Sequence, residues 1–144
     1  MKRFEFGLEK VRRWRHEQVD MEERKLLQLH SELKTLTAER QRLDTEAQTA
    51  QKSLRVGAAI SAGDLHHLDV FKQYVRAQSQ KLATQERACE SKIAEQRKLV
   101  IEALRQAELL ERLKTQALAC WRSAYQKEEE GLAAELFLAK RKRH

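Results

Sequence analysis

The chain has 144 residues, enough for one domain of ordinary size, with no proline and only four glycines. Charged residues make up 35% of the chain and aromatic residues only 6%. This composition is typical of coiled coils and long helices, and it disfavours a thick globular core. The net charge is +7, with basic residues concentrated near both ends. Such ends suit an acidic protein, an anionic membrane or a nucleic acid, or they stay solvated without a partner.

The cysteines and the hydropathy pattern indicate a cellular compartment. Cys89 and Cys120 have neither metal-binding nor redox-motif spacing, which favours reduced thiols in the cytosol. The basic start is not followed by the apolar stretch of a signal peptide, and no run approaches the length of a membrane span. We therefore expect a cytoplasmic protein, which can still work beside a membrane.

The sequence offers no pattern that supports catalysis. It has no phosphate-binding glycine loop and no nucleophile elbow. His66 and His67 are adjacent, so on a helix they point to different faces and do not share a metal. The glutamates at 128–130 have no pocket to perturb their pKa values on a thin coiled coil. We expect no enzymatic activity, no cofactor and no metal site.

The first predicted element is a helix over about residues 4–56. Apolar residues recur at heptad spacing, which predicts a coiled-coil seam interrupted by Arg40. A second short seam near the start is offset from the later one. The later seam consists of Leu26, Leu33, Ala47 and Leu54 at one position and Leu29, Leu36, Leu43 and Ala50 at the other, and the early seam of Phe4, Leu8 and Val11.

A turn is predicted over about residues 57–63. Gly57 can end the first helix in a left-handed conformation, and Gly63 lies six residues later. Ser61 or Asp64 can cap the next helix. A connection this short forces the two helices to lie antiparallel.

The second predicted helix covers about residues 64–138 and is followed by a basic tail at 139–144. Its seam is weaker, because polar residues interrupt it. Folding back at the turn places Leu26 near Ile93 and Phe4 near Gln116, so the helix beyond Ala117 is expected to overhang unpaired. The apolar seam comprises Leu65, Leu68, Val75, Leu82, Cys89, Ile93, Val100, Ala103, Ala107, Leu110, Ala117, Trp121 and Ala124, with Lys72, Ser79, Glu86, Gln96 and Lys114 interrupting it.

Taken together, these elements predict an all-α fold in which a single coiled-coil domain spans residues 1–144. Its two long helices form an antiparallel coiled-coil hairpin, and the second helix is longer and overhangs. The overhang bears apolar residues that a lone helix cannot bury, and such a stripe usually marks a partner surface, although it can also dimerise or fray. These residues are Trp121, Tyr125, Leu132, Leu136 and Phe137.

The opening residues follow the pattern Phe4-x-Phe6-x-Leu8-x-x-Val11 and lead into a charged helix. This start resembles that of the flagellar export protein FliJ family. The resemblance spans essentially the whole chain, including its length, the glycine- and serine-containing hairpin, and the ending. The matching later features are Leu65, Leu68, Phe71, Tyr74 and Val75 after the turn, then Leu110–Lys114, Tyr125, a glutamate run and a basic tail.

The resemblance implies a non-enzymatic component of the flagellar type III export apparatus, similar in shape to the central stalk of rotary ATPases. Such proteins bind the export ATPase FliI, the export gate FlhA and export chaperones at the cytoplasmic face of the inner membrane. Seven residues are assigned by position to the ATPase end, namely Phe4, Leu8, Val11, Trp121, Tyr125, Leu132 and Leu136. Phe71, Val75, Gln78 and Leu82 form a stripe that is the best candidate for the gate contact. For Val75 and Leu82, packing in the seam is an equally good interpretation.

Two alternatives remain open. The equivalent stalk protein of a virulence type III secretion system has the same shape. A nucleic-acid-binding coiled coil would place Arg12, Arg13 and Arg15 on DNA, as basic-region helices do. Acidic residues intervene among these arginines, and a hairpin is not a parallel zipper, so we expect no nucleic acid as a partner.

Overall fold

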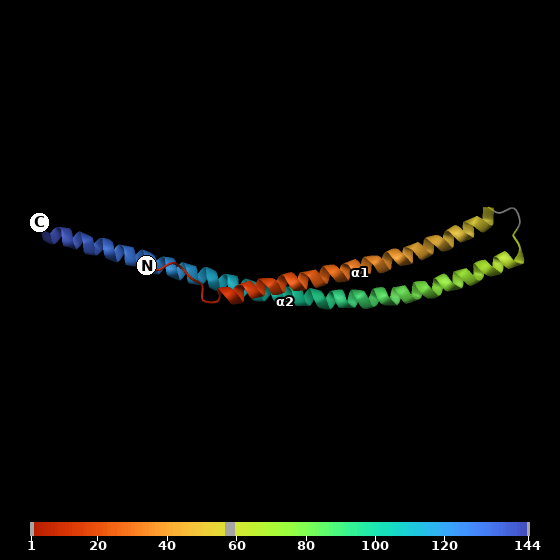
Figure 1. Ribbon diagram of the computed structural model, residues 1–144, viewed down its shortest axis with the longest axis horizontal. Helices are drawn as coiled ribbons and strands as arrows, with labels where there is room; N and C mark the ends of the chain where they lie inside the picture. The colour runs from red at the N-terminus through yellow and green to blue at the C-terminus, as the bar shows by residue number, and fades with distance from the viewer. Residues whose placement is uncertain (1, 57–59, 144) are drawn as a thin grey trace. The chain divides into compact units, whose positions relative to one another are not determined.

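The computed structural model describes residues 2–56 and 60–143. It contains helix α1 (Glu9–Val56) and helix α2 (Ala62–Arg143), and these described residues include no strand. The two helices pack against each other, so the fold is the predicted all-α antiparallel hairpin with a longer second helix (Figure 1). The chain divides into two compact units. Unit 1 comprises Met1–Met21 and Val100–His144, and unit 2 comprises Glu22–Leu99.

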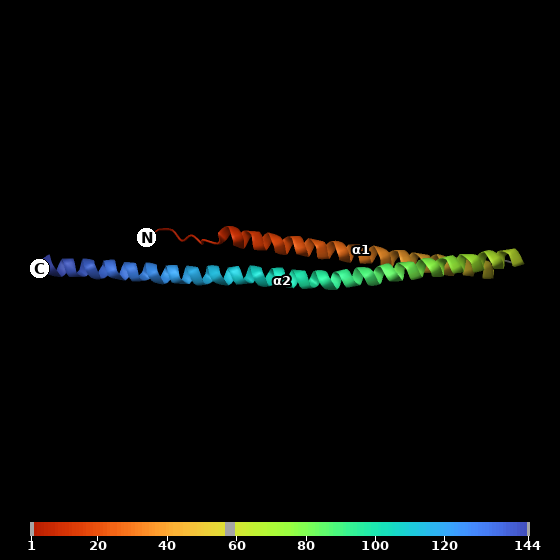
Figure 2. The same cartoon turned by 90° about the horizontal axis from the view of Figure 1, so that it is seen from below.

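Unit 2 is a paired segment of α1 and α2, whose ribbons run alongside each other in Figure 1 and overlap toward the turn in the view turned by 90° (Figure 2). The Cys89 thiol donates a hydrogen bond to the Leu29 carbonyl oxygen at 3.4 Å, and the Gln96 amide donates to the Glu22 carbonyl oxygen at 3.0 Å. Later residues of α2 therefore meet earlier residues of α1, as an antiparallel pair requires. These two contacts bracket the predicted pairing of residues 26 and 93 and confirm that register.

The core of unit 2 is a thin seam between the helices. The buried residues recur at alternating three- and four-residue spacing, as in coiled coils. Among the described residues, no large side chain is completely buried. Stability therefore comes from many partial burials, at roughly 25 cal/mol for each Å² of apolar surface removed from water. The buried seam residues of unit 2 are Leu43, Val75, Glu86, Cys89, Ile93 and Gln96.

A polar layer interrupts this seam, as the sequence predicted. Arg40 forms an ion pair with Glu86 at 3.1 Å, and the Glu86 residue is only 8% exposed. The second carboxylate oxygen of Glu86 and the hydroxyl of Ser79 have no hydrogen-bonding partner among the described protein atoms. Such a layer lowers stability, because burying a polar group without a partner costs about 1–3 kcal/mol, and it can fix the register of the pair.

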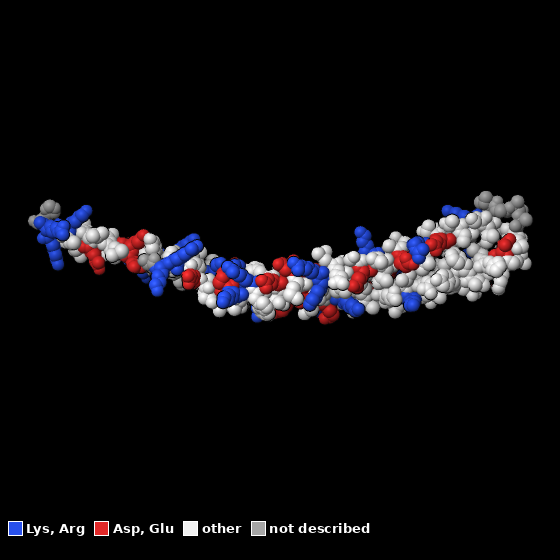
Figure 3. Space-filling view, in the orientation of Figure 1, with Lys and Arg blue, Asp and Glu red and all other residues white. Residues whose placement is uncertain are grey.

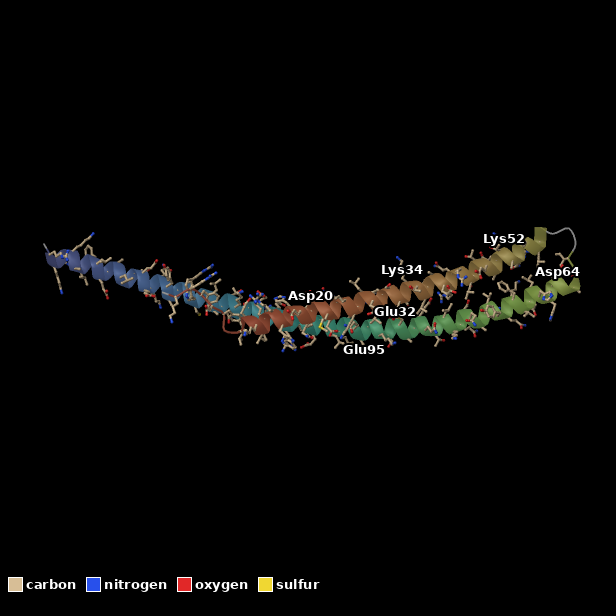
Figure 4. All side chains as sticks on the ribbon, in the orientation of Figure 1. Asp20, Glu32, Lys34, Lys52, Asp64 and Glu95 are labelled. Atoms are coloured by element: carbon tan, nitrogen blue, oxygen red, sulfur yellow. The ribbon has the colours of Figure 1, made fainter. Side chains whose placement is uncertain are left out.

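The start of α2 differs slightly from the prediction. Ser61 caps the helix, since its hydroxyl accepts a hydrogen bond from the Asp64 amide at 3.1 Å and the Asp64 carboxylate accepts one from the Ser61 amide at 3.2 Å. This reciprocal pair is a capping box, and Asp64 is labelled in Figure 4. The helix therefore begins at Ala62, and Gly63 belongs to its first turn rather than to the connection. The predicted role of Gly57 falls outside the described residues.

Helix α1 begins at Glu9 rather than near Phe4. Residues 2–8, which we call the N-terminal segment, are not helical, and the Glu9 amide donates to the Phe6 carbonyl oxygen at 3.1 Å. Gly7 accounts for part of this difference, because glycine costs about 1 kcal/mol in a helix relative to alanine. The predicted offset seam is also wrong. The less exposed positions of α1 in unit 1 are Glu9, Arg12, Arg15, Gln18 and Val19, and of these Arg12, Arg15 and Val19 keep the heptad register of the later seam.

The chain end is helical instead of forming a separate basic tail. Helix α2 continues to Arg143, and its last turn consists of Lys140–Arg143. Cations are favourable at a helix C-terminus, where the macrodipole places partial negative charge. The cluster therefore supports the helix end, and it appears as a group of blue side chains there (Figure 3).

Candidate functional site

Three aromatic side chains gather in unit 1. The ring of Phe4 lies against that of Trp121, with centroids 6.0 Å apart, and Trp121 stacks on Tyr125 at 5.4 Å. The Trp121 indole donates a hydrogen bond to the Lys2 carbonyl oxygen at 3.3 Å. Trp121 and Tyr125 are four residues apart on one face of α2, which is the spacing at which helical side chains meet. We call these three residues the aromatic cluster.

The aromatic cluster corrects the predicted pairing of Phe4 with Gln116. A non-helical chain covers more length per residue than the 1.5 Å rise of a helix. The N-terminal segment therefore carries Phe4 farther along α2, to Trp121. The overhang is expected to begin after Ala117, but the contact with Trp121 shows that α2 is covered beyond that residue.

An ionic network joins α1 to α2 beside the aromatic cluster. Arg12 donates to Glu9 at 3.0 Å and to Glu111 at 2.7 Å. His16 Nε2 lies 2.7 Å from Glu111 Oε1, and Lys114 Nζ lies 3.2 Å from Glu9. The Arg12 hydrogen bond, with a further one from Lys114, lowers the pKa of Glu9 to about 2. Hydrogen bonds from His16 and Arg12 lower the pKa of Glu111.

The network favours a structural role over a chemical one. Carboxylates held ionised by cations are poor proton acceptors at neutral pH, because their pKa lies far below it. Among the described residues, no group of three or more His, Cys, Asp or Glu side chains is placed to hold a metal ion. The network also pairs Arg12 with two carboxylates, so the guanidinium that the nucleic-acid alternative requires already has anionic partners.

The end of α2 is exposed beyond the aromatic cluster, as predicted for the overhang. Leu136 and Phe137 are each 65% exposed, and Leu132 and Leu138 are also largely exposed. Tyr125 is more exposed than Trp121, and the neighbouring Glu129 carboxylate raises the pKa of its hydroxyl. We call residues 126–143 the overhang. It combines unpaired apolar side chains with a cationic end.

The residues assigned to the ATPase end therefore fall into three groups. Phe4, Trp121 and Tyr125 are brought together in the aromatic cluster. Leu8, the last residue of the N-terminal segment, and Val11, in the first turn of α1, are exposed. Leu132 and Leu136 are exposed in the overhang and do not join the cluster.

The stripe assigned to the gate lies in unit 2 and is mixed. Val75 is only 5% exposed and packs between the helices, which matches the interpretation of this residue as part of the seam. Leu82 is partly buried at a seam position as well. Phe71 and Gln78 lie beside the seam and keep part of their surface exposed. Only the latter two present side chains beside the seam that a partner can reach.

Unit 1 has a further surface that the sequence pattern did not predict. Exposed apolar residues occupy positions just before the seam positions on both helices, and Val11 and Leu109 line a common groove. We call this surface the apolar lateral face. The heptad spacing could have revealed this surface, because positions that flank a two-helix seam are usually charged and here several of them are apolar. Its members are Val11, Trp14, Met21, Leu109 and Leu113.

Comparisons with protein-family models, curated proteins and solved structures find no match to this chain. Of the helices that the structure describes, neither is long and apolar enough to cross a membrane.

Proposed function

We propose that this chain is a non-enzymatic coupling protein of flagellar type III export. It acts at the cytoplasmic face of the inner membrane, at the flagellar base, and links the export ATPase to the export gate. The observation that carries the proposal is the opening motif itself, which resembles the start of the FliJ family. The packing of Phe4 from that motif on Trp121 supports it by giving the motif a structural task.

The ATPase contact is proposed for the aromatic cluster and the overhang. An exposed apolar stripe on an unpaired helix is a common partner surface, because a groove or ring on another protein can bury it. The cationic end at Lys140–Arg143 would favour an acidic lining in that partner. The N-terminal segment packs on Trp121. The ATPase can therefore bind near Trp121 either with this segment in place or after the segment has moved away from the ring.

The gate contact is proposed for the flank of unit 2 near Phe71 and Gln78. Both residues lie on α2, and neither is fully buried in the seam. Val75, which lies between them in sequence, is buried in the seam and helps to hold α2 against α1. Export chaperones are proposed as further partners, on the strength of the family resemblance alone.

Co-purification tests this proposal. The full chain is mixed with the FliI-like export ATPase, and separately with the cytoplasmic domain of the FlhA-like gate. We expect both to be retained. Replacing Leu132 and Leu136 with glutamate should abolish ATPase binding, whereas Leu27→Glu, at a residue that is 70% exposed in unit 2, should not.

The gate contact has its own matched variants. Phe71→Ala combined with Gln78→Ala should weaken retention of the gate domain, while Val70→Ala on a neighbouring exposed position should leave it unchanged. Retention of both partners by both sets of variants would remove the site assignments. Failure of the unaltered chain to bind either partner would contradict the function, and would turn attention to the virulence stalk and nucleic-acid alternatives.

A further inference from the structure

The two sides of the seam in unit 1 differ sharply in chemistry. One side holds the ionic network around Glu111, in which Glu9 and His16 flank the seam. The other side is the apolar lateral face. Two-stranded coiled coils usually place charged residues on both flanks, where they face water and pair across the seam. The ionic side also carries Leu104, which is 46% exposed, but the exposed apolar residues of α1 gather on the other side. A flank that widens the apolar stripe of both helices in this way is the pattern of a helix pair that can receive a third helix.

The apolar lateral face has a groove at its centre. Its apolar lining is Val11 of α1 and Leu109 and Leu110 of α2, and its polar lining is Arg15, Glu102, Arg105 and Gln106. Leu109 is 59% exposed, the most exposed large apolar residue in the groove. The groove therefore has an apolar floor and a guanidinium on each helix, which is suited to an apolar side chain followed by a carboxylate.

The apolar residues of this face recur at helical spacing. On α1, Val11, Trp14 and Met21 follow at intervals of three and seven residues, and on α2, Leu109 and Leu113 are four apart. The guanidinium of Arg15 lies over the Trp14 ring, 4.6 Å from its centre, and Trp14 is 48% exposed. Parallel apolar rows on two packed helices form a hydrophobic groove that takes an amphipathic helix through side chains spaced at three and four residues.

The charged residues around the apolar lateral face indicate which kind of helix can bind there. The border of the face carries more cations than carboxylates. The ion pairs of Arg105 with Glu102 and Arg112 with Glu108 are exposed pairs within one helix, and such pairs are weak and exchange readily. The cations are Lys10, Arg15, Arg105 and Arg112, and the carboxylates are Glu17, Glu102 and Glu108; Lys10 and Arg15 are the cations of this border that form none of these ion pairs.

We propose that the apolar lateral face is the docking site for an acidic amphipathic helix of a partner protein. A second copy of this chain is a poorer occupant, because it would bring the same cationic border and the same net charge of +7. The docked helix places its apolar residues on Val11 and Leu109 and its carboxylates near Arg15 and Arg105. This surface is separate from the overhang and from the Phe71 region.

The test uses the full chain and a synthetic, fluorescently labelled amphipathic helix roughly three heptads long, with leucine at seam positions and glutamate at the flanks. Binding is followed by fluorescence anisotropy. The glutamate peptide should bind, and a peptide with lysine at the same flanks should bind at least about tenfold more weakly. Leu109→Glu should weaken binding about tenfold or more, and Leu27→Glu should leave it unchanged.

A charge variant and the oligomeric state complete the test. Arg105→Glu should weaken binding of the glutamate peptide and strengthen binding of the lysine peptide. Arg122→Glu, which lies outside the face, should change neither affinity. Circular dichroism confirms that each variant keeps its helix content, which is expected because Leu109 and Arg105 are exposed. Equal binding of the two peptides, or unchanged binding by Leu109→Glu, would overturn the proposal. A dimer that Leu109→Glu dissociates would also overturn it, in favour of a second copy as the occupant.

Discussion

Replacing Glu86 with leucine should stabilise the hairpin. The residue is buried at a seam position, one of its carboxylate oxygens has no partner among the described atoms, and its other oxygen pairs with Arg40. Removing a buried, partly satisfied carboxylate relieves about 1–3 kcal/mol of desolvation. Leucine and glutamate have similar helix propensities, so the change acts through burial rather than through the backbone.

The loss of the Arg40 pair offsets only part of this gain. The Arg40 side chain is 40% exposed, so its guanidinium can return to water when its partner is removed. Replacing a buried ion pair with apolar residues is often stabilising by about 1–4 kcal/mol. We therefore expect Glu86→Leu to raise the free energy of unfolding by roughly 1–3 kcal/mol. Each kcal/mol should raise the melting temperature by about 2–4 °C in a chain of this length.

Thermal unfolding followed by circular dichroism at the helix band measures the effect. Glu95→Leu is the matched control, because Glu95 lies in the same helix with a side chain that is 71% exposed (Figure 4). It should change stability by less than about 0.5 kcal/mol. A lower melting temperature for Glu86→Leu would contradict this expectation and would show that the Arg40 pair stabilises the fold by more than its desolvation costs. An equal rise in the control would show a general effect of added leucine.

Three further predictions concern the ends of the hairpin. In a Trp14→Phe background, where Trp121 is the remaining tryptophan of the chain, Phe4→Ala should shift the fluorescence to longer wavelength, because the Trp121 ring loses an aromatic contact worth about 0.5–1.5 kcal/mol; an unchanged spectrum would contradict the contact. The pKa of Glu9 is lowered in the folded chain, so the stability that Glu9 contributes is present above its ordinary pKa near 4.5 and is lost as pH falls toward 2. Glu9→Gln should therefore make the melting temperature depend less on pH over this range. An unchanged dependence on pH would argue against the Arg12 pair. Ser61→Ala should cost about 1 kcal/mol in chemical denaturation, and Ser61→Asn should restore most of it.

Much of the fold can be predicted from local pattern. Heptad spacing, the absence of proline and the capping residues Ser61 and Asp64 all act over a few residues, so the sequence displays them directly. The register of unit 2 follows from the length of the connection, and the Cys89 and Gln96 contacts confirm it.

The N-terminus could not be predicted in the same way. The start of α1 depends on a balance between helix formation through Gly7 and the packing of Phe4 on Trp121, which is distant in sequence. The ionic network also needs Arg12 and Glu111 to meet across the two helices, and a shift of one residue in register would separate them. Long-range contacts of this kind are not visible in periodicity.

Some of the candidate surfaces could be predicted from the sequence and others could not, because the latter depend on how the two helices pack. The exposure of Leu132 and Leu136 follows from the unequal helix lengths, which the sequence reveals. Val75 could belong to the seam or to a partner, and only the packed structure places it in the seam. The groove between Val11 and Leu109 joins two rows that lie far apart in sequence, so its apolar floor emerges only when the helices are paired.

Protein export in a strain that lacks this chain tests the proposed coupling role most directly. Swimming motility and the secretion of flagellar export substrates are measured in the deletion strain, and again after the full chain or a chain ending at Ala117 is supplied. We expect both motility and secretion to be lost on deletion, to be restored by the full chain and not to be restored by the truncated one. Full motility and normal secretion without the chain would contradict the proposed role.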